Sequence, residues 1–358
     1  MPPFWNRNRP SPSGIRIEAE SSGQIDDYLS SQIPDDGPGL ALAVVKSATI
    51  VHAAGYGLAD IRSGVPIVQD TIFHLASCGK QFTGLGILML AEEGKLSLDD
   101  PLGKHLPSLA GFGPRVTIRQ LLHHTSGIRD LYDDDGVQEV LTRCEQPANG
   151  DLVRTYAELG CPTAERGIEP GDQFSYSNSG YDLLGAVIER VSSQPYRDFF
   201  QGRVFDVLGM KDTFSVPNSR VEDPRCATGY IVDDRNEFVE HGSSEFDGLV
   251  GSGSFYTSVM DLCRYDRSLR AFGLASRAAT LDMFTAGRTN DGTSTNYGFG
   301  WFLGSSEGMP FADHEGAWNG YRSYICCWLD MPLSIFVLSN HPEIELLELA
   351  NLAIDVYR

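Results

Sequence analysis

The chain has 358 residues, of which 28 are Lys or Arg and 48 are Asp or Glu, so its formal net charge is −20 at pH 7. Nucleic acids and anionic membranes bind basic surfaces, so this acidic balance leads us to expect neither as a partner. The length exceeds the usual size of one core, which predicts one large two-lobed domain or two domains.

The cysteines and the N-terminal segment indicate in which cellular compartment the protein is expected. Seven cysteines, none in a Cys-x-x-Cys pair, give no reason to expect a disulfide framework or a zinc site, and they favour a reducing environment. The N-terminal segment lacks the apolar core of a signal peptide, and no run reaches the roughly 20 apolar residues that span a bilayer. A cytoplasmic protein is the interpretation, with a leader removed by processing as the alternative. The oligomeric state is not predicted.

Two groups of elements are expected at the chain ends. Residues 1–18, rich in Pro, Asn, Arg and Ser, predict an extended arm. The N-terminal group then has a helix at 24–33 and a hairpin of strands at 40–46 and 50–57. The C-terminal group has strands at 297–303, 323–329 and 334–339, followed by a helix at 343–357 with apolar residues at helical spacing.

The middle of the chain is helical in character, with candidate helices at 83–93, 116–123, 181–191 and 259–272. Strands at both ends around a helical middle predict an α/β (α+β) fold, in which an antiparallel sheet built from both chain ends is flanked by helices and carries an inserted all-helical lobe. One domain would cover 19–358, with the sheet lobe at 19–75 and 288–358 and the helical lobe at 76–287. A substrate cleft is expected between the lobes.

Ser77 and Lys80 form the only Ser-x-x-Lys in the chain, at the start of a predicted helix. Residues three apart on a helix share a face, so the amine can reach the hydroxyl and activate it as a nucleophile. A base near neutrality requires the lysine pKa to fall from about 10.4 to about 7, which corresponds to roughly 4–5 kcal/mol. Taken alone, an N-capping serine followed by an exposed lysine is the commoner use of this pattern.

Two further motifs carry polar groups. Tyr176 and Asn178 lie on a turn before the helix at 181–191, where a phenol can pass a proton and an amide can orient a substrate. His314 begins His-Glu-Gly, in which Gly316 permits close approach to the backbone. The N–H of Ala317 could there complete an oxyanion hole with that of Ser77. The structural alternatives are a loop anchor with a helix cap, and a histidine beside a glycine bulge.

The combination resembles the serine β-lactamase and penicillin-binding-protein-like hydrolases, in particular the branch of class C β-lactamases, D-peptidases and family VIII esterases. The resemblance extends to Ile118–Ile128, to Pro170-Gly171 ahead of Phe174–Tyr181, to Val207–Met210 with Thr213, and to Gly251–Ser254 before Thr257-Ser258. The order and spacing of these segments cover about residues 20–355. The pattern is more specific for fold and mechanism than for substrate.

By this resemblance, Ser77 is the acylated nucleophile, Lys80 its base or base partner, and Tyr176 the proton shuttle. His314 takes the position that lysine fills in Lys-Thr-Gly members, and would supply polarity or positive charge. The resemblance also implies substrate contacts from the amide two residues after Tyr176 and from the segment that begins with His-Glu-Gly. These residues are Asn178, Gly316, Trp318, Tyr321 and Arg322. The resemblance implies neither metal nor other cofactor, and a small-molecule ester, amide or D-amino-acid compound as the partner.

One departure concerns the substrate. Glu315 replaces the hydroxyl residue that family members use beside a substrate carboxylate, with Asp313 nearby and only Arg322 to offset the charge. A serine hydrolase of neutral esters, a carboxylesterase, is therefore predicted first. A D-stereospecific peptidase or amidase comes second and a class C-like β-lactamase third. A non-catalytic scaffold of the same fold is the alternative from another class.

Other candidates are weaker. Ser294-Thr295-Asn296 also fits Ser-x-Asn but follows the helical lobe, the wrong place in the order. Cys78 adjoins the nucleophile and is expected to pack in the core. The pair His123-His124 lacks partners at metal-ligand spacing, and the acidic run at 133–136 lacks the rest of a calcium loop.

Overall fold

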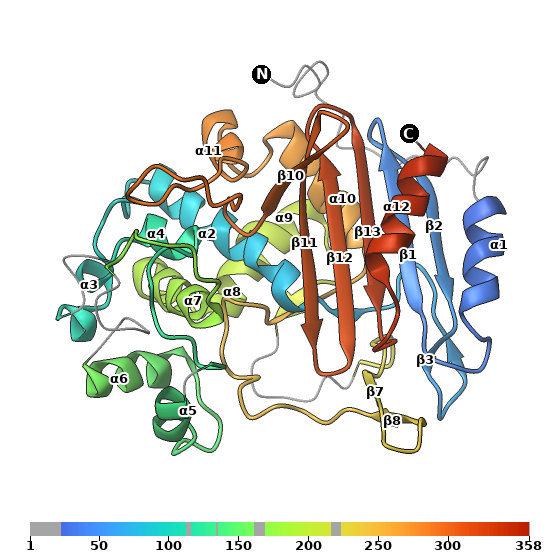
Figure 1. Ribbon diagram of the computed structural model, residues 1–358, viewed down its shortest axis with the longest axis horizontal. Helices are drawn as coiled ribbons and strands as arrows, with labels where there is room; N and C mark the ends of the chain where they lie inside the picture. The colour runs from blue at the N-terminus through green and yellow to red at the C-terminus, as the bar shows by residue number, and fades with distance from the viewer. Residues whose placement is uncertain (1–22, 112–115, 134, 161–168, 216–222, 358) are drawn as a thin grey trace.

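The computed structural model describes residues 23–111, 116–133, 135–160, 169–215 and 223–357, and the arm predicted for residues 1–18 lies outside them. A six-stranded antiparallel sheet, ordered β10-β11-β12-β13-β1-β2, joins the two ends of the chain (Figure 1). Strands β1 and β13, which come from opposite ends of the chain, pair inside this sheet, with Leu40 opposite Ser339. Most of the remaining helices gather beyond the β10 edge, on the left of Figure 1.

The strands have the following bounds: β1 Leu40–Lys46, β2 Thr49–Tyr56, β3 Leu58–Asp60, β4 Val65–Pro66, β5 Phe73–His74, β6 Phe214–Ser215, β7 Tyr230–Val232, β8 Phe238–Glu240, β9 Phe255–Thr257, β10 Phe302–Ser306, β11 Met309–Trp318, β12 Tyr321–Trp328 and β13 Leu333–Ser339. The α-helices are α1 Gly23–Gln32, α2 Lys80–Glu92, α3 Leu102–His105, α4 Ile118–Leu122, α5 Asp135–Leu141, α6 Asn149–Leu159, α7 Asn178–Ser192, α8 Tyr196–Phe200, α9 Asp206–Leu208, α10 Val259–Ala271, α11 Arg277–Asp282 and α12 Leu346–Tyr357. Shorter helical turns are η1 Ala76–Gly79, η2 Pro107–Leu109 and η3 Gln201–Phe205.

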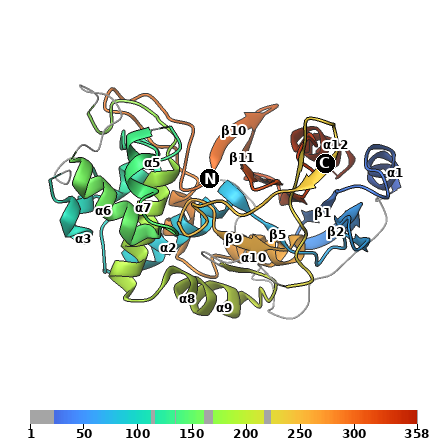
Figure 2. The same ribbon diagram turned by 90° about the horizontal axis from the view of Figure 1, so that it is seen from below.

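The inner strand β1 is apolar from residue 40 to residue 45 because both faces of the sheet are covered. Alternate residues of a strand point to opposite faces. Leu40, Leu42 and Val44 therefore pack in one core with α1 and α12, whereas Ala41 and Ala43 face the larger core of α2, α7 and α10. Figure 2, seen from below, shows α10 beneath the sheet and α1 and α12 on its other side. The sheet is the middle layer of the molecule.

The predicted fold class is confirmed, and so are most elements, including the hairpin β1–β2 and the helices α2, α7, α10 and α12. Two predictions near the C-terminus were wrong. The strand expected at 297–303 begins only at Phe302, and the ten-residue strand β11 was missed. Its residues include Pro310, Asp313, Glu315 and Gly316, which do not form an apolar run, because only alternate side chains are buried.

The segment 76–287 contains more than helices. It also supplies strands β6 to β9, of which β9 pairs with β5 in a small three-stranded sheet. Helix α10 packs against β1 and β13 rather than among the helices beyond β10. These additions matter for the site, since β5 leads directly into the turn that carries Ser77.

Candidate active site

The nucleophile turn packs on the end of strand β11. Ser77 lies in η1, which continues into α2, and η1 is in close contact with β11. Gly316 makes this approach possible, because a Cβ there would lie 2.4 Å from the Ser323 hydroxyl and 2.8 Å from the Leu75 carbonyl. Ala76, directly before Ser77, has φ 48°, an uncommon conformation for a residue with a side chain. The turn is thus held in one place by packing.

Lys80 lies within hydrogen-bond distance of Ser77, as the spacing predicted. Its Nζ is 3.1 Å from the Ser77 hydroxyl, 2.7 Å from Asn178 Oδ1 and 2.8 Å from the Ser252 carbonyl. An amide oxygen and a carbonyl can only accept hydrogen bonds, so two N–H groups of the amine are directed to Asn178 and Ser252. In the neutral amine, the remaining lone pair faces the Ser77 hydroxyl, ready to take its proton.

Burial favours that neutral amine. Lys80 is wholly buried, and desolvation lowers its pKa from 10.5 to about 7, although the carboxylates of Asp182 and Asp130 act in the opposite direction. A lysine with a pKa near neutrality is poised for general-base catalysis at physiological pH. The strong downward shift that the motif required is therefore present, and its physical cause is desolvation.

Tyr176 joins the pair from the loop before α7. The Lys80 Nζ lies 4.9 Å from the centre of the Tyr176 ring. Desolvation raises the pKa of Tyr176 above its usual 10, while a hydrogen bond with Ser77 acts in the opposite direction. The phenol therefore holds its proton, and Lys80 is the better base of the two.

His314 is a neutral wall of the site rather than a cation. It is 2% exposed, and burial with the nearby Lys80 lowers its pKa to about 3. Its Nδ1 donates to the Glu315 carbonyl at 2.5 Å, so its Nε2 accepts from the Tyr297 hydroxyl at 3.0 Å. The imidazole of His314 therefore carries no positive charge and contributes only its polarity to the site.

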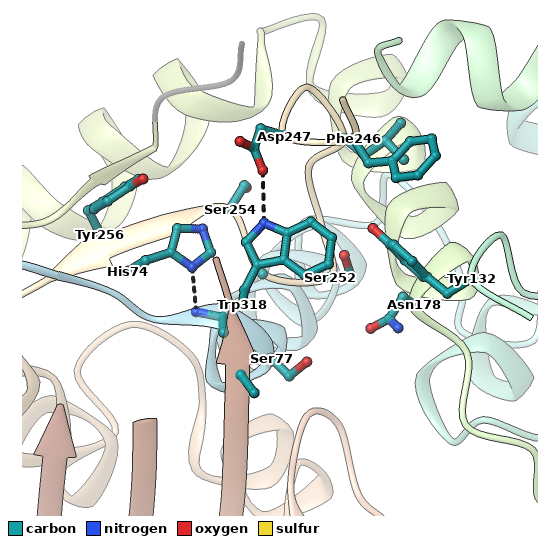
Figure 3. A pocket seen from close by; sticks show the side chains of 14 residues that line it. His74, Ser77, Tyr132, Asn178, Phe246, Asp247, Ser252, Ser254, Tyr256 and Trp318 are labelled. Atoms are coloured by element: carbon teal, nitrogen blue, oxygen red, sulfur yellow. Dashed lines mark hydrogen bonds between the residues drawn. The ribbon is translucent and has the colours of Figure 1, made fainter. Parts of the chain in front are cut away.

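A cavity of about 180 Å³ opens beside Ser77 (Figure 3). Asn178 and Tyr132 lie on one side of it and His74 on the opposite side, with Trp318 between them and Asp247 above Trp318. Its lining consists of His74, Ala76, Ser77, Tyr132, Asn178, Phe246, Asp247, Leu249, Ser252, Gly253, Ser254, Tyr256, Ala317 and Trp318. Ser77 and Ala317 both border it, and the oxyanion hole formed by their backbone N–H groups stays a prediction.

Three predicted contacts lie away from this cavity. Tyr321 donates to the Ala227 carbonyl at 2.6 Å and lines a neighbouring cavity. Arg322 and Gly316 border a third cavity together with Glu315, and Arg322 donates to the Pro342 carbonyl. Successive side chains of β11 and β12 point to opposite faces, and this alternation turns Glu315 and Arg322 from Ser77. Glu315 and Arg322 thus border the third cavity rather than the one beside Ser77, and their effect on a substrate charge stays a prediction.

Sequence reasoning missed two groups that support the site. Asp182, one helical turn after Asn178 in α7, is wholly buried and accepts the Ser252 N–H at 2.8 Å, which orients the carbonyl that holds Lys80. The i, i+4 spacing from Asn178 is the signal that could have identified it. Asp247, Tyr132 and Phe246 come from loops that carry no motif, so no sequence pattern pointed to them.

The histidine pair has structural partners. His123 Nδ1 lies 2.9 Å from the Tyr297 carbonyl, and His124 Nδ1 accepts the Ser177 N–H at 3.0 Å. His124 also packs its ring 4.3 Å from that of Tyr176, so it positions the tyrosine loop.

The remaining candidates from the sequence show no separate site. Cys78 is buried and donates to the His314 carbonyl. No cluster of three metal-ligating side chains occurs within the described ranges, nor a helix long and apolar enough to cross a membrane.

An antiparallel sheet with a Ser-x-x-Lys helix at its edge, faced by a tyrosine loop, defines a protein of the serine β-lactamase and transpeptidase fold. The family model described as Beta-lactamase matches residues 30–356, and the chain belongs to that family. It is 32% identical over 313 residues to penicillin-binding protein 4* of Bacillus subtilis (strain 168), which covers 82% of this chain and 66% of that protein. The chain thus spans slightly less than two thirds of that relative's length.

Solved structures agree on the fold. The octameric penicillin-binding protein homologue of Pyrococcus abyssi superposes with a TM-score of 0.79 at 26% identity, over 94% of this chain and 77% of the other. The D-amino acid amidase of Ochrobactrum anthropi SV3, complexed with L-phenylalanine amide, superposes with a TM-score of 0.71 at 23% identity, over 89% of this chain and 90% of the other. At this identity, the likeness to the amidase shows the fold alone.

Proposed function

We propose that this protein is a serine hydrolase that forms an acyl-enzyme at Ser77 and acts best on uncharged carboxylic esters. One observation carries the proposal. A buried lysine whose pKa is lowered to about 7 lies 3.1 Å from the hydroxyl of a serine that borders an open cavity. A scaffold has no use for a desolvated amine beside an accessible hydroxyl, whereas an acyl-transfer site requires both.

The steps follow from the positions of the groups. Ser77 Oγ attacks the carbonyl carbon as its proton moves to Lys80 Nζ, and the oxyanion is stabilised by the N–H groups of Ser77 and Ala317. The C–O bond to the leaving alcohol then breaks, and Tyr176 gives that oxygen its proton and takes one from Lys80. Water, deprotonated by Lys80, attacks the acyl-enzyme, and the acid leaves as Ser77 regains its proton.

The charge of the cavity favours a neutral substrate. Asp247 is the one charged side chain in the lining as described. A free substrate carboxylate would meet Asp247 without a cation to offset the repulsion, which disfavours β-lactams and peptides that end in a carboxylate. Esters need no such cation, and their alkoxide leaving groups need less assistance than amines.

An amide or peptide of a D-amino acid is the second candidate. The carboxylate of Asp247 in the lining attracts a substrate ammonium, which such compounds carry next to the reacting carbonyl. The name of the Bacillus relative, a penicillin-binding protein, also favours acylation by an amide. A β-lactam is the third candidate.

A substrate panel with a covalent probe tests these alternatives. We expect wild type to hydrolyse p-nitrophenyl esters faster than D- or L-aminoacyl anilides or nitrocefin, and a fluorophosphonate to add its phosphonyl group to Ser77, as located by mass spectrometry. Ser77→Ala should abolish both signals, while Ser294→Ala, in the rejected Ser-x-Asn segment, should retain them. Faster turnover of D-aminoacyl anilides would select the second candidate. Absence of any adduct on Ser77 would indicate a non-catalytic scaffold.

A further inference from the structure

His74 has no part in the steps above, yet it lies in the wall of the same cavity. It is the last residue of β5, only 7% exposed, and three residues before Ser77. Its ring packs edge-on against Tyr256 with centroids 4.8 Å apart. Figure 3 shows the ring on the side of the cavity opposite Asn178 and Tyr132. A buried imidazole at this place has one nitrogen for the backbone and one for the cavity.

The backbone contact fixes the tautomer of the ring. Nδ1 of His74 accepts the N–H of Ala76 at 3.1 Å, so Nδ1 carries no proton. Burial lowers the pKa of His74 to about 3, so the imidazole is neutral at physiological pH. A neutral imidazole that accepts at Nδ1 carries its proton on Nε2. The ring therefore presents an N–H donor at its far end.

That donor faces the cavity. Nε2 points away from Ala76, into the space bounded by Ser254, Tyr256 and Asp247 (Figure 3). None of the described residues accepts a hydrogen bond from it. Because His74 borders an open cavity, a ligand that supplies an acceptor there would take the place of water at Nε2.

The position of Tyr176 indicates which part of a substrate enters. Tyr176 protonates the leaving group in the proposed reaction, and it does not line the cavity. The leaving group therefore lies toward Tyr176, and the acyl group occupies the cavity in which His74 and Asn178 face each other. Asp247 disfavours an anionic acyl group there, which leaves an uncharged oxygen as the suitable acceptor.

We propose that His74 determines acyl specificity, with Nε2–H donating to an uncharged oxygen, such as a ketone or amide carbonyl, carried by the acyl group beyond the reacting carbonyl. This inference rests on the proposed hydrolase function. It predicts that oxygen-bearing acyl esters are better substrates than alkanoyl esters of the same length, because only the former satisfy the donor.

Two variants test the roles of the two ring nitrogens of His74 one at a time. In His74→Asn the amide oxygen can replace Nδ1 as acceptor for Ala76, but the distal donor is lost. In His74→Gln the longer amide can replace the distal donor, while the acceptor for Ala76 is lost. His341→Asn is the matched control, since His341 Nδ1 accepts the N–H of Glu343, also two residues on, at 3.2 Å. His341 borders none of the cavities described above.

The experiment compares kcat/KM for p-nitrophenyl 4-oxopentanoate and 5-oxohexanoate with that for pentanoate and hexanoate. Relative to wild type, we expect His74→Asn to lower the oxo preference about tenfold and to leave the rate of fluorophosphonate labelling of Ser77 unchanged. His74→Gln should keep the preference for oxo esters. Ser77 of this variant should be labelled more slowly, because the N–H of Ala76 has lost its acceptor. His341→Asn should match wild type in both measurements.

Each other outcome counts against the inference. An unchanged oxo preference in His74→Asn, with labelling retained, would overturn it. If both variants show the same fall in labelling rate and in melting temperature, His74 has only a structural role, and the inference is overturned as well. If wild type turns over esters but shows no oxo preference, the inference fails while the proposed function stands. If the probe does not label Ser77 in wild type, both fail.

Discussion

The two sides of Ser77 differ in construction. On the base side, Lys80 and His314 are buried and Tyr176 is partly buried, and desolvation displaces the pKa of each toward its uncharged form. On the cavity side, Trp318 and Asp247 form the wall, and this wall comes from a strand end and a loop. On the base side Lys80 is held by hydrogen bonds to Asn178 and Ser252, whereas the cavity side is open and holds His74, whose Nε2 has no acceptor among the described residues.

This difference teaches where chemistry and specificity reside. Groups that move protons must be desolvated to reach the required pKa values, so Lys80 lies on the buried helix α2 and Tyr176 on the loop that leads into α7. Groups that contact the acyl part need only shape and a few donors, so loops can provide them. Substitutions on the base side should therefore change the rate of acylation, and those on the cavity side should change substrate affinity.

The largest effect is expected for Lys80→Met, which keeps an apolar stem but removes the base. We expect kcat/KM for p-nitrophenyl butyrate to fall roughly 10²- to 10⁴-fold, the usual contribution of a general base. Lys95→Met, at an exposed lysine beyond α2, is the control and should be unaffected. Retention of most of the activity by Lys80→Met would assign the base role to another group.

Gly316→Ala tests whether the close contact of β11 with the nucleophile turn is required. The added methyl group would lie 2.4 Å from the Ser323 hydroxyl and 2.8 Å from the Leu75 carbonyl, of which the latter is backbone and cannot yield. Such overpacking should lower the free energy of unfolding by about 1–3 kcal/mol, measured in urea. Gly150→Ala in α6, where the nearest atom is 3.7 Å away, should not destabilise. Equal stability of the two variants would contradict the packing argument.

Trp318→Phe tests the cavity side. The indole Nε1 donates to Asp247 at 2.8 Å, and the variant loses this bond while Asn319 still holds the carboxylate at 3.0 Å. Loss of one such bond should raise KM about fivefold. The fluorophosphonate labelling rate should not change, because Trp318 contacts neither Lys80 nor Tyr176. A fall in labelling with an unchanged KM would show that the two sides are not separable.

The smallest effect on rate is expected for Asp182→Asn. The carboxylate of Asp182 raises the pKa of Lys80 against the effect of burial, so its removal should lower that pKa further. The acid limb of kcat/KM should then move to lower pH, while the rate on the alkaline plateau stays the same. The amide oxygen can still accept the Ser252 N–H. A shift to higher pH would contradict the electrostatic role.

Much of the base side could be predicted from the sequence, because local spacing determines it. Ser77 and Lys80 are three residues apart on one helix, and the loop with Tyr176 and Asn178 follows a recognisable turn. On the cavity side, the resemblance implied Trp318 as a substrate contact, whereas no pattern indicated Asp247, since the two meet only after β11 forms and β11 has no apolar run. The face of the sheet on which Glu315 lies could not be predicted for the same reason, because it depends on the register of β11.

The most direct test is the pH dependence of fluorophosphonate labelling at Ser77 in the free enzyme. Because the probe does not ionise, the profile reports the base and the phenol alone. The rate should rise with pH through about 7, as Lys80 loses its proton, and stay level beyond pH 10, since burial raises the pKa of Tyr176. A rise centred near 10.5, the ordinary lysine value, or a profile without an acid limb, would contradict a desolvated Lys80 as the base.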